Sequence, residues 1–148
     1  MSDETSPPAP RLGDQLCHAL YSASSALTQA YRPLLEPLGL TYPQFIVMMA
    51  LWEDDDVPAS TLAGRVRLGK STMTPLLRRL EGKGLVERRV NADDERQLRI
   101  RLTAAGADLA TAGSQAADQA FCATGLDLEE ALELRQRCLE LIANLDRD

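Results

Sequence analysis

Residues 80–106 read LEGKGLVERRVNADDERQLRIRLTAAG, and the spacing of their apolar side chains changes after Gly84. The run LVERRV is followed by the polar NADDER and then by QLRIRL. In QLRIRL the apolar Leu98, Ile100 and Leu102 alternate with polar residues, which is the period of a strand with one buried face. The stretch therefore predicts a β-hairpin with a charged tip.

Two short helices are predicted directly before this hairpin. Ser60 is a suitable cap for a helix that runs to about Val66, residues 67–69 form a turn that contains a glycine, and a second helix covers about Ser71–Gly82. Pro75 favours this late start, because a proline deeper in a helix removes a backbone hydrogen bond. Two such helices followed by a basic two-stranded ribbon make a winged helix-turn-helix, whose second helix enters the DNA major groove.

Longer helices are predicted on both sides of this unit. Apolar residues recur at helical spacing from Arg11 until Pro33, and a buried helix is entered through Thr41, Tyr42 and Pro43. Downstream, Thr103 caps a helical region that ends near Phe121. Asp127 and Glu130 have the spacing of a capping box before a near-heptad apolar stripe that includes Cys138, which we interpret as a core residue.

The predicted fold class is mainly α with a small β-hairpin wing. Residues 1–10 form a flexible tail, and residues 11–148 form a single domain. In that domain the winged helix-turn-helix covers about 41–103, and dimerisation helices cover about 11–33 and 104–148.

The charge is unevenly distributed, although the formal net charge is −6. Residues 60–101 carry eleven Lys and Arg against five Asp and Glu, which indicates a DNA-reading segment between acidic ends. The N-terminus lacks the features of a signal peptide, and no apolar run has membrane-spanning length. Three cysteines without a CxxC pair and a single histidine argue against a metal site. We therefore expect a cytoplasmic protein with no cofactor, no metal and no membrane partner.

Candidate DNA-binding residues lie on the second helix and on the hairpin. Hydroxyl groups and free backbone N–H groups at the helix start can meet phosphates or base edges, and a proline there can touch a thymine methyl group. Arginines on the hairpin can follow the phosphate backbone or enter a narrow minor groove. The candidates are Lys70, Ser71, Thr72, Thr74, Pro75, Arg78, Arg79, Arg88, Arg89 and Arg96. Asp94 is interpreted as a brace that holds the Arg96 guanidinium through a bidentate pair.

The hairpin sequence resembles the signature of the multiple antibiotic resistance regulator (MarR) family, in which the wing follows the pattern D-x-R-x-x-x-I/V-x-L-T. In DERQLRIRLT the matching residues are Asp94, Arg96, Ile100, Leu102 and Thr103. The resemblance implies a homodimer built by the first and last two helices. It also implies that each subunit reads half of a pseudo-palindromic operator in double-stranded DNA, and that the protein is a transcriptional regulator and not an enzyme.

The N-terminal half, LCHALYSASSALTQAYRPLLEPLGLTYPQFIVMMALWE, resembles the organic hydroperoxide resistance regulators. In that family a cysteine on the first helix senses peroxide between two tyrosines of the other subunit, and Cys17, Tyr31 and Tyr42 match these positions. Cys17 shares a helix face with Tyr21 and Tyr31. Tyr31 lies fourteen residues further along the same predicted helix, roughly 21 Å away, so only a partner subunit can bring it to Cys17.

The resemblance also implies a resolving cysteine at Cys122, and hence a disulfide between Cys17 of one subunit and Cys122 of the other. The resulting hypothesis is a repressor that binds its operator when reduced and releases it when an organic hydroperoxide oxidises Cys17. One alternative is a regulator controlled by a small phenolic ligand. A remote alternative is a thiol peroxidase, although the peroxiredoxin motif P-x-x-x-T/S-x-x-C is absent from the sequence.

Overall fold

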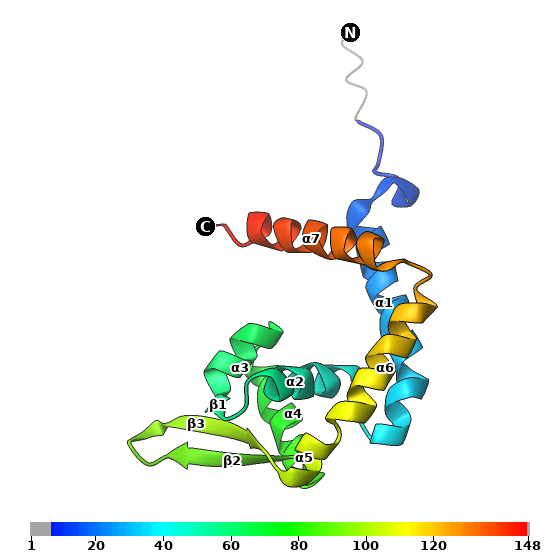
Figure 1. Ribbon diagram of the computed structural model, residues 1–148. Helices are drawn as coiled ribbons and strands as arrows, with labels where there is room; N and C mark the ends of the chain where they lie inside the picture. Colours follow the sequence, from blue (N-terminus) through cyan, green and yellow to red (C-terminus); the bar gives the residue numbers. More distant parts are fainter. Residues whose placement is uncertain (1–6, 148) are drawn as a thin grey trace.

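The computed structural model describes residues 7–147 (Figure 1). Residues 42–108 form a head, and the helices within residues 16–35 and 110–145 form a long arm. The elements in chain order are η1 (Leu12–Asp14), α1 (Leu16–Leu35), η2 (Glu36–Leu38), α2 (Tyr42–Glu53), β1 (Val57–Pro58), α3 (Ala59–Val66), α4 (Lys70–Gly82), β2 (Val86–Asn91), β3 (Asp94–Leu102), α5 (Ala104–Asp108), α6 (Ala110–Ala123) and α7 (Leu128–Leu145). The fold is mainly helical with one small sheet, as the sequence predicted.

Helix α2 is the centre of the head. It packs against α1, α3, α4 and α6, and its Phe45, Val47, Met48 and Leu51 are fully buried. A helix with neighbours on several sides needs apolar residues around most of its circumference, which α2 has. Its start is set by a capping box, in which the Thr41 side chain accepts from the backbone N–H of Gln44 and the Gln44 side chain accepts from that of Thr41.

The wing is an antiparallel hairpin of β2 and β3, whose strands are joined by residues 92–93. Val86 lies opposite Leu102 and Arg88 lies opposite Ile100, which fixes the register. A two-residue strand, β1, pairs with the other edge of β3 and was not anticipated from the sequence. Buried Val86 and Ile100 turn towards the helices and attach the hairpin to the core.

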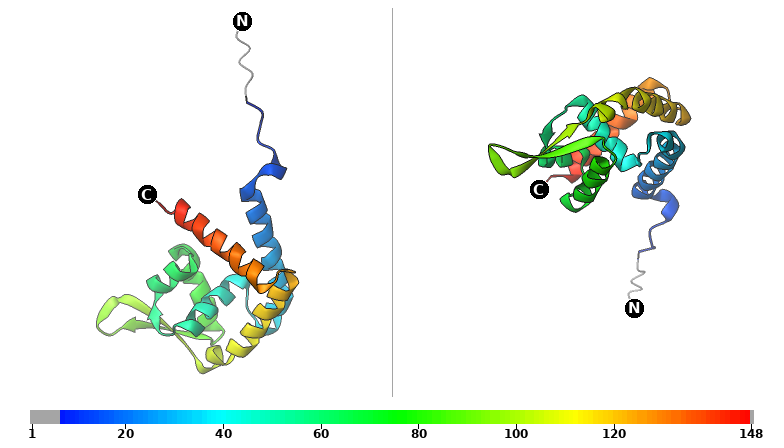
Figure 2. Two further views of the ribbon diagram at one scale, coloured as in Figure 1. Left: turned by 45° about the horizontal axis from the view of Figure 1, so that its top comes forward. Right: turned by 90° about the horizontal axis from the view of Figure 1, so that it is seen from below.

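The arm consists of α1, α6 and α7. Helices α1 and α6 lie side by side, and α7 turns away from the end of α6 and runs back over the head towards α3 (Figures 1 and 2). The α6–α7 corner contains Gly125 with a φ of 71°. Asp127 and Glu130 form the expected capping box at the start of α7, and α7 has no buried residue.

Two helices differ from their predicted bounds, and both contain a proline. Helix α1 begins at Leu16 instead of Arg11, and it continues past Pro33 because Leu35 is 1% exposed and anchors its last turn in the core. Helix α4 begins at Lys70 with Gly69 as its N-cap, so neither Ser71 nor Thr72 caps it and Pro75 lies inside it. In both cases burial of the apolar face outweighs the backbone hydrogen bond that the proline removes.

The other helical predictions agree with the structure except at two places. Thr103 caps α5 by accepting from the backbone N–H of Gly106 at 3.0 Å, but the helical region breaks at Leu109 into α5 and α6. Helix α3 begins one residue before Ser60, with Pro58 as its N-cap. Within residues 7–147 no single helix has the length and apolar character needed to span a membrane. Only Leu16–Leu38 and Tyr42–Glu53 taken together pass that test, across a bend of 71°.

Candidate DNA-binding surface and redox site

Helix α4 has one buried face and one exposed face. Met73, Leu76, Leu77 and Leu80 point into the core. The opposite face exposes the residues that the sequence marked for DNA, namely Lys70, Ser71, Thr72, Thr74, Pro75, Arg78 and Arg79. The burial of one face therefore fixes which side chains α4 can present to a duplex.

Thr74 differs from the other hydroxyl residues of α4. Its Oγ1 donates to the backbone carbonyl of Lys70 at 3.0 Å. That hydrogen bond occupies the only proton of the hydroxyl group, so Thr74 retains acceptor capacity but has no free donor. Ser71 and Thr72 carry no such bond among residues 7–147 and are the better candidates for donating to phosphate oxygens.

Two arginines that were expected to follow phosphates are engaged within the protein. Arg88 pairs with Glu81 of α4 at 3.0 Å, and Arg89 pairs with Glu87 at 3.0 Å. Each guanidinium therefore already has a carboxylate partner in this structure, and contact of Arg88 and Arg89 with phosphates stays a prediction. Arg96 is exposed and has no ion-pair partner among residues 7–147.

Asp94 was expected to hold the Arg96 guanidinium, and the structure shows a different contact. Its Oδ1 accepts from the backbone N–H of Arg96 at 3.0 Å. The side chain of aspartate is short and bonds readily to the amide two residues further along, as in an Asx turn. Asp94 therefore fixes the backbone at the wing tip and leaves the guanidinium free.

Glu81 and Glu87 are the acidic residues that sequence reasoning missed. Hydrogen bonding to Arg88 lowers the pKa of Glu81 below its ordinary value, and hydrogen bonding to Arg101 together with the charge of Arg89 lowers that of Glu87. Glu81 is on α4 and Arg88 is on β2, so the folded turn between these two elements brings the side chains together.

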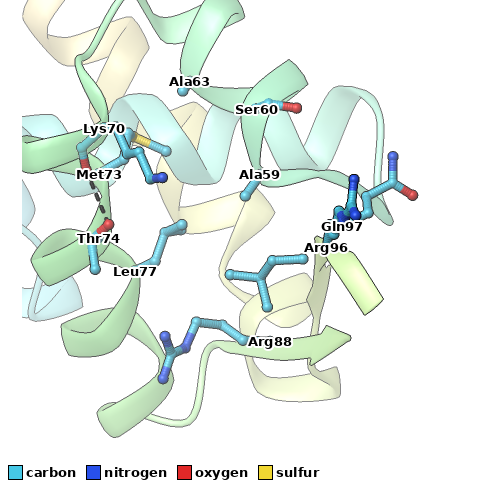
Figure 3. A pocket seen from close by; sticks show the side chains of 11 residues that line it. Ala59, Ser60, Ala63, Lys70, Met73, Thr74, Leu77, Arg88, Arg96 and Gln97 are labelled. Carbon is cyan, nitrogen blue, oxygen red and sulfur yellow. Dashed lines mark hydrogen bonds between the residues drawn. The ribbon is translucent and has the colours of Figure 1, made fainter. Parts of the chain in front are cut away.

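A cavity of about 520 Å³ lies between α3, α4 and the wing. Its floor is apolar, and its rim carries Lys70 and Arg96 on opposite sides, with Arg88 below (Figure 3). Cations on either side of a concave surface attract and position an anionic backbone. The lining residues are Ala59, Ser60, Ala63, Lys70, Met73, Thr74, Leu77, Arg88, Arg96, Gln97 and Leu98.

The three cysteines are free thiols in separate places. Cys17 is the second residue of α1 and is exposed, and Cys122 is exposed at the penultimate position of α6. Cys138 is half-buried on α7, so its interpretation as a core residue does not hold within this chain. Cys17 lies in the first turn of α1, where the backbone N–H groups have no partner within the helix.

Tyr31 and Tyr42 form an aromatic pair. Their ring centroids are 5.0 Å apart, and the Tyr31 ring is 5.5 Å from that of Phe45. Burial and the neighbouring Tyr42 raise the pKa of Tyr31, and burial raises that of Tyr42, so both phenols stay protonated as hydrogen-bond donors. Tyr21 is 75% exposed and does not join this pair.

A second cavity, of about 540 Å³, lies beside Tyr42 at the corner between α1 and α2. Its lining is mixed: Leu35, Leu40 and Pro43 are apolar, whereas Thr28 and Arg32 are polar. It can accept a small apolar molecule with a polar or anionic end.

Lys83 connects this corner to α4. Its Nζ donates to Gln44 Oε1 at 2.8 Å and to the carbonyl of Gly39. Gln44 is 3% exposed and directly follows Pro43 and Tyr42 in the chain. The C-terminal end of α4 is thus bonded to the segment that carries one of the two phenols.

The arm exposes a large apolar surface. Leu16 on α1 is 65% exposed, and Leu128 on α7 is 66% exposed. Leu12, Tyr21, Leu27, Phe121, Leu132, Leu134, Leu139 and Leu145 are exposed as well. Apolar surface of this extent on a folded chain is characteristic of a protein–protein interface.

The hairpin, the two helices before it and the arm define a winged helix-turn-helix protein with a basic reading surface. The MarR family model matches residues 40–98. The organic hydroperoxide resistance transcriptional regulator of Bacillus subtilis (strain 168) is 36% identical over 126 residues, which are 85% of this chain and 84% of that protein. The chain belongs to the MarR family, and it is a transcriptional regulator, like the relatives that it matches, and not an enzyme.

Solved structures of regulators share the fold. Reduced AbfR bound to DNA, a protein of Staphylococcus epidermidis, has a TM-score of 0.78 and 31% identity, covering 93% of this chain and 96% of that one. Disulfide-formed AbfR has a lower TM-score of 0.64 at 34% identity, covering 91% and 90%. NadR in complex with 4-hydroxyphenylacetate has a TM-score of 0.74 and 28% identity, covering 90% and 96%.

Proposed function

We propose that this protein is a homodimeric repressor that binds a pseudo-palindromic operator when reduced and releases it when an organic hydroperoxide oxidises Cys17. The observation that carries the proposal is the position of the thiol on α1 relative to the two phenols, of which Tyr31 is on α1 and Tyr42 begins α2. Cys17 is exposed in the first turn, and the Tyr31–Tyr42 pair lies near the opposite end of the same helix. Two copies packed with α1 helices antiparallel would bring each thiol to the phenols of the other.

The exposed apolar faces of α1 and α7 support the dimer. Leucines that are more than half exposed, such as Leu16, Leu128 and Leu132, would be buried by a second copy. Burial of this kind stabilises association by roughly 25 cal/mol for each Å² of apolar area. The two reading heads would then lie on the same side of the dimer, as a palindromic site requires.

The chemistry of the switch has two steps. The Cys17 thiolate attacks the terminal oxygen of the hydroperoxide, so an S–O bond forms, the O–O bond breaks, and the alcohol leaves after taking up a proton. The Cys122 thiol of the partner subunit then attacks the sulfenic sulfur, so an S–S bond forms, the S–O bond breaks, and water leaves. Two thiols and one hydroperoxide give one disulfide, one alcohol and one water.

Comparison with AbfR supports a structural change in this second step. The chain matches the reduced, DNA-bound form of AbfR better than the disulfide form, with TM-scores of 0.78 and 0.64. Disulfide geometry requires the two sulfurs to approach to about 2 Å, so the helices that carry Cys17 and Cys122 must move together. We propose that this movement separates the reading heads from their operator.

The test is DNA binding by the reduced and the oxidised protein. The probe is a duplex selected by the reduced wild type from a random-sequence pool, and the oxidant is a stoichiometric amount of cumene hydroperoxide. We expect the wild type to lose the gel shift and to form a covalent dimer on non-reducing electrophoresis. Cys17→Ser should keep the gel shift, Cys122→Ser should form no covalent dimer, and Cys138→Ser, the matched control, should behave like the wild type. A Cys17→Ser protein that still responds to peroxide would overturn the proposal.

A second candidate function is regulation by a small phenolic acid. The mixed cavity beside Tyr42 favours it, as does the likeness to NadR, which was solved with 4-hydroxyphenylacetate. Here the ligand would occupy the cavity, and Cys17 would have no role in the response. Two measurements on Cys17→Ser separate the candidates: calorimetric titration with 4-hydroxyphenylacetate, and a gel shift in its presence. Only the ligand hypothesis predicts heat of binding in the first and loss of DNA binding in the second.

A further inference from the structure

One ion pair joins the arm to the reading head. The guanidinium of Arg67 donates to both carboxylate oxygens of Asp146, from Nη1 to Oδ2 at 2.9 Å and from Nη2 to Oδ1 at 3.2 Å. The other ion pairs among residues 7–147 all connect residues within the head. The Arg67–Asp146 pair spans 79 positions of sequence and has the bidentate geometry that fixes orientation as well as distance.

Arg67 lies at a sensitive point of the head. It is in the turn between α3 and α4, three residues before α4 begins, and its φ is 56°, in the left-handed region that residues other than glycine rarely adopt. A side chain anchored at this position constrains the turn that sets the direction of α4.

Asp146 lies directly after the last residue of α7 and caps its C-terminus. Helix α7 has 18 residues and none of them is buried in this chain, so its position relative to the head depends on its two ends. One end is the α6–α7 corner, where Gly125 adopts a left-handed conformation, and the other is the pair with Arg67. Helix α7 is therefore a rod of roughly 27 Å that is held at both ends.

We propose that Arg67 and Asp146 are positioning residues that latch the last dimerisation helix to the helix-turn-helix, so that α7 sets the orientation of the reading head. The role of α7 in a dimer and in redox switching rests on the proposed function. Cys122 lies six residues before α7, so a disulfide formed there acts on the opposite end of the same rod. Movement of the corner is then transmitted to the turn before α4.

The electrostatics of the pair agree with this role. Hydrogen bonding to Asp146 raises the pKa of Arg67, and hydrogen bonding to Arg67 lowers that of Asp146. Their side chains are 57% and 55% exposed, so salt screens the attraction. A latch of this strength holds the reduced orientation and still opens when α7 moves, because an exposed pair is weak compared with a disulfide.

The test measures the distance between α7 and the wing within one chain. Nitroxide labels are placed by Ala92→Cys in the hairpin turn and Glu133→Cys on the polar face of α7, in a chain that also carries Cys17→Ser, Cys122→Ser and Cys138→Ala. Labelled chains are diluted with unlabelled chains, so that double electron–electron resonance reports distances within a chain. This measurement uses neither DNA nor peroxide, and its outcome is independent of the redox proposal.

We expect a narrow distance distribution in the parent protein and a broader or shifted one after Arg67→Gln or Asp146→Asn. The reversed pair, Arg67→Asp with Asp146→Arg, should restore the narrow distribution. High salt should broaden the distance distribution of the parent but not that of Arg67→Gln. The matched control is Arg65→Gln, which breaks an ion pair inside the head and should leave the distance unchanged. Equal distance distributions in the parent and in both single variants would overturn the proposal. The proposal would also be overturned if the reversed pair folded normally, as judged by circular dichroism, but did not restore the parent distribution.

A second experiment measures how binding depends on operator spacing. It compares the affinity for the selected duplex with the affinity for a version that has one base pair inserted between the half-sites. The latched protein should discriminate between them more strongly than Arg67→Gln, by about two- to fivefold, which is the range that an exposed ion pair supports. If the redox proposal failed but the Arg67–Asp146 pair still positioned α7, both experiments would give the expected results.

Discussion

Glu81 of α4 accepts three hydrogen bonds from Arg88 of β2. Its Oε1 accepts from Nε at 3.1 Å and from Nη2 at 3.0 Å, and its Oε2 accepts from the backbone N–H at 3.3 Å. The last turn of the reading helix and the first strand of the wing are thereby held at a fixed separation. A protein that contacts a major groove and the adjacent minor groove together requires such a fixed separation.

Glu81→Gln should weaken operator binding by about three- to tenfold, the range expected for losing one such hydrogen-bonded connection. A decrease in affinity is informative, because removing a negative charge near DNA would by itself strengthen binding. Fluorescence anisotropy with the selected duplex measures the effect. Glu95→Gln removes an exposed carboxylate of the wing and is the control, for which we expect equal or stronger binding. Equal gains for both variants would show that the Glu81–Arg88 connection does not matter in the complex.

The salt dependence of binding should separate free arginines from paired ones. Arg79 has no ion-pair partner among residues 7–147, so Arg79→Gln should reduce the slope of log affinity against log salt by about 0.9 if this side chain contacts a phosphate. Arg88→Gln should weaken binding without changing that slope, because its charge is already paired with Glu81. Affinities measured from about 50 to 200 mM KCl give both slopes. Equal reductions would mean that Arg88 leaves Glu81 when DNA binds.

Gly106→Ala should destabilise the fold strongly. A Cβ at this buried position would lie 2.1 Å from the carbonyl oxygen of Leu85, a backbone atom that cannot move aside cheaply. We expect a loss of about 2–4 kcal/mol in the free energy of unfolding by urea, the range of severe overpacking in a core. Gly64→Ala is the matched control, because nothing lies within 4 Å of its Cβ inside α3, and it should stabilise by up to about 1 kcal/mol. Similar effects of the two substitutions would contradict the close contact between α5 and Leu85.

The Tyr31–Tyr42 pair predicts a loss of stability at alkaline pH. Burial raises the pKa of both phenols in the folded state, so the folded protein keeps protons that the unfolded chain begins to lose near pH 10. The free energy of unfolding should therefore be unaffected by these groups below about pH 10 and fall as the pH rises through their folded-state pKa values. Urea unfolding at pH 9 and pH 11 measures the fall. The double variant Tyr31→Phe with Tyr42→Phe should show a smaller fall, and an equal one would exclude the phenols as its cause.

Local signals explain which features the sequence predicted. Capping residues act over three positions, so the box at Asp127 and the cap at Thr103 were visible in the sequence. Thr41 was identified as the entry to α2, but its capping box with Gln44 was not predicted. The alternation of QLRIRL likewise identified β3 as a strand with one buried face. Together these signals predicted the order of helices and the wing.

Contacts between distant positions explain what was missed. Nothing in the sequence indicates that Arg88 meets Glu81 or that Arg67 meets Asp146, because both contacts depend on turns whose geometry the folded chain sets. The helices that contain Pro33 and Pro75 were misjudged at their ends for a related reason. Local chemistry disfavours proline there, and only the tertiary core, which buries residues such as Leu35, compensates for it.

The pairing of arginines with carboxylates has a consequence for how this acidic protein meets DNA. Most ion pairs of residues 7–147 lie inside the head and neutralise arginines there, whereas Lys70, Arg78, Arg79 and Arg96 keep their charge facing solvent. The segments outside residues 60–101 are strongly negative. The negative arm repels an approaching duplex, and the positive surface of α4 and the wing attracts it. Electrostatic steering therefore turns the DNA-binding side of the protein towards the duplex before the two molecules touch.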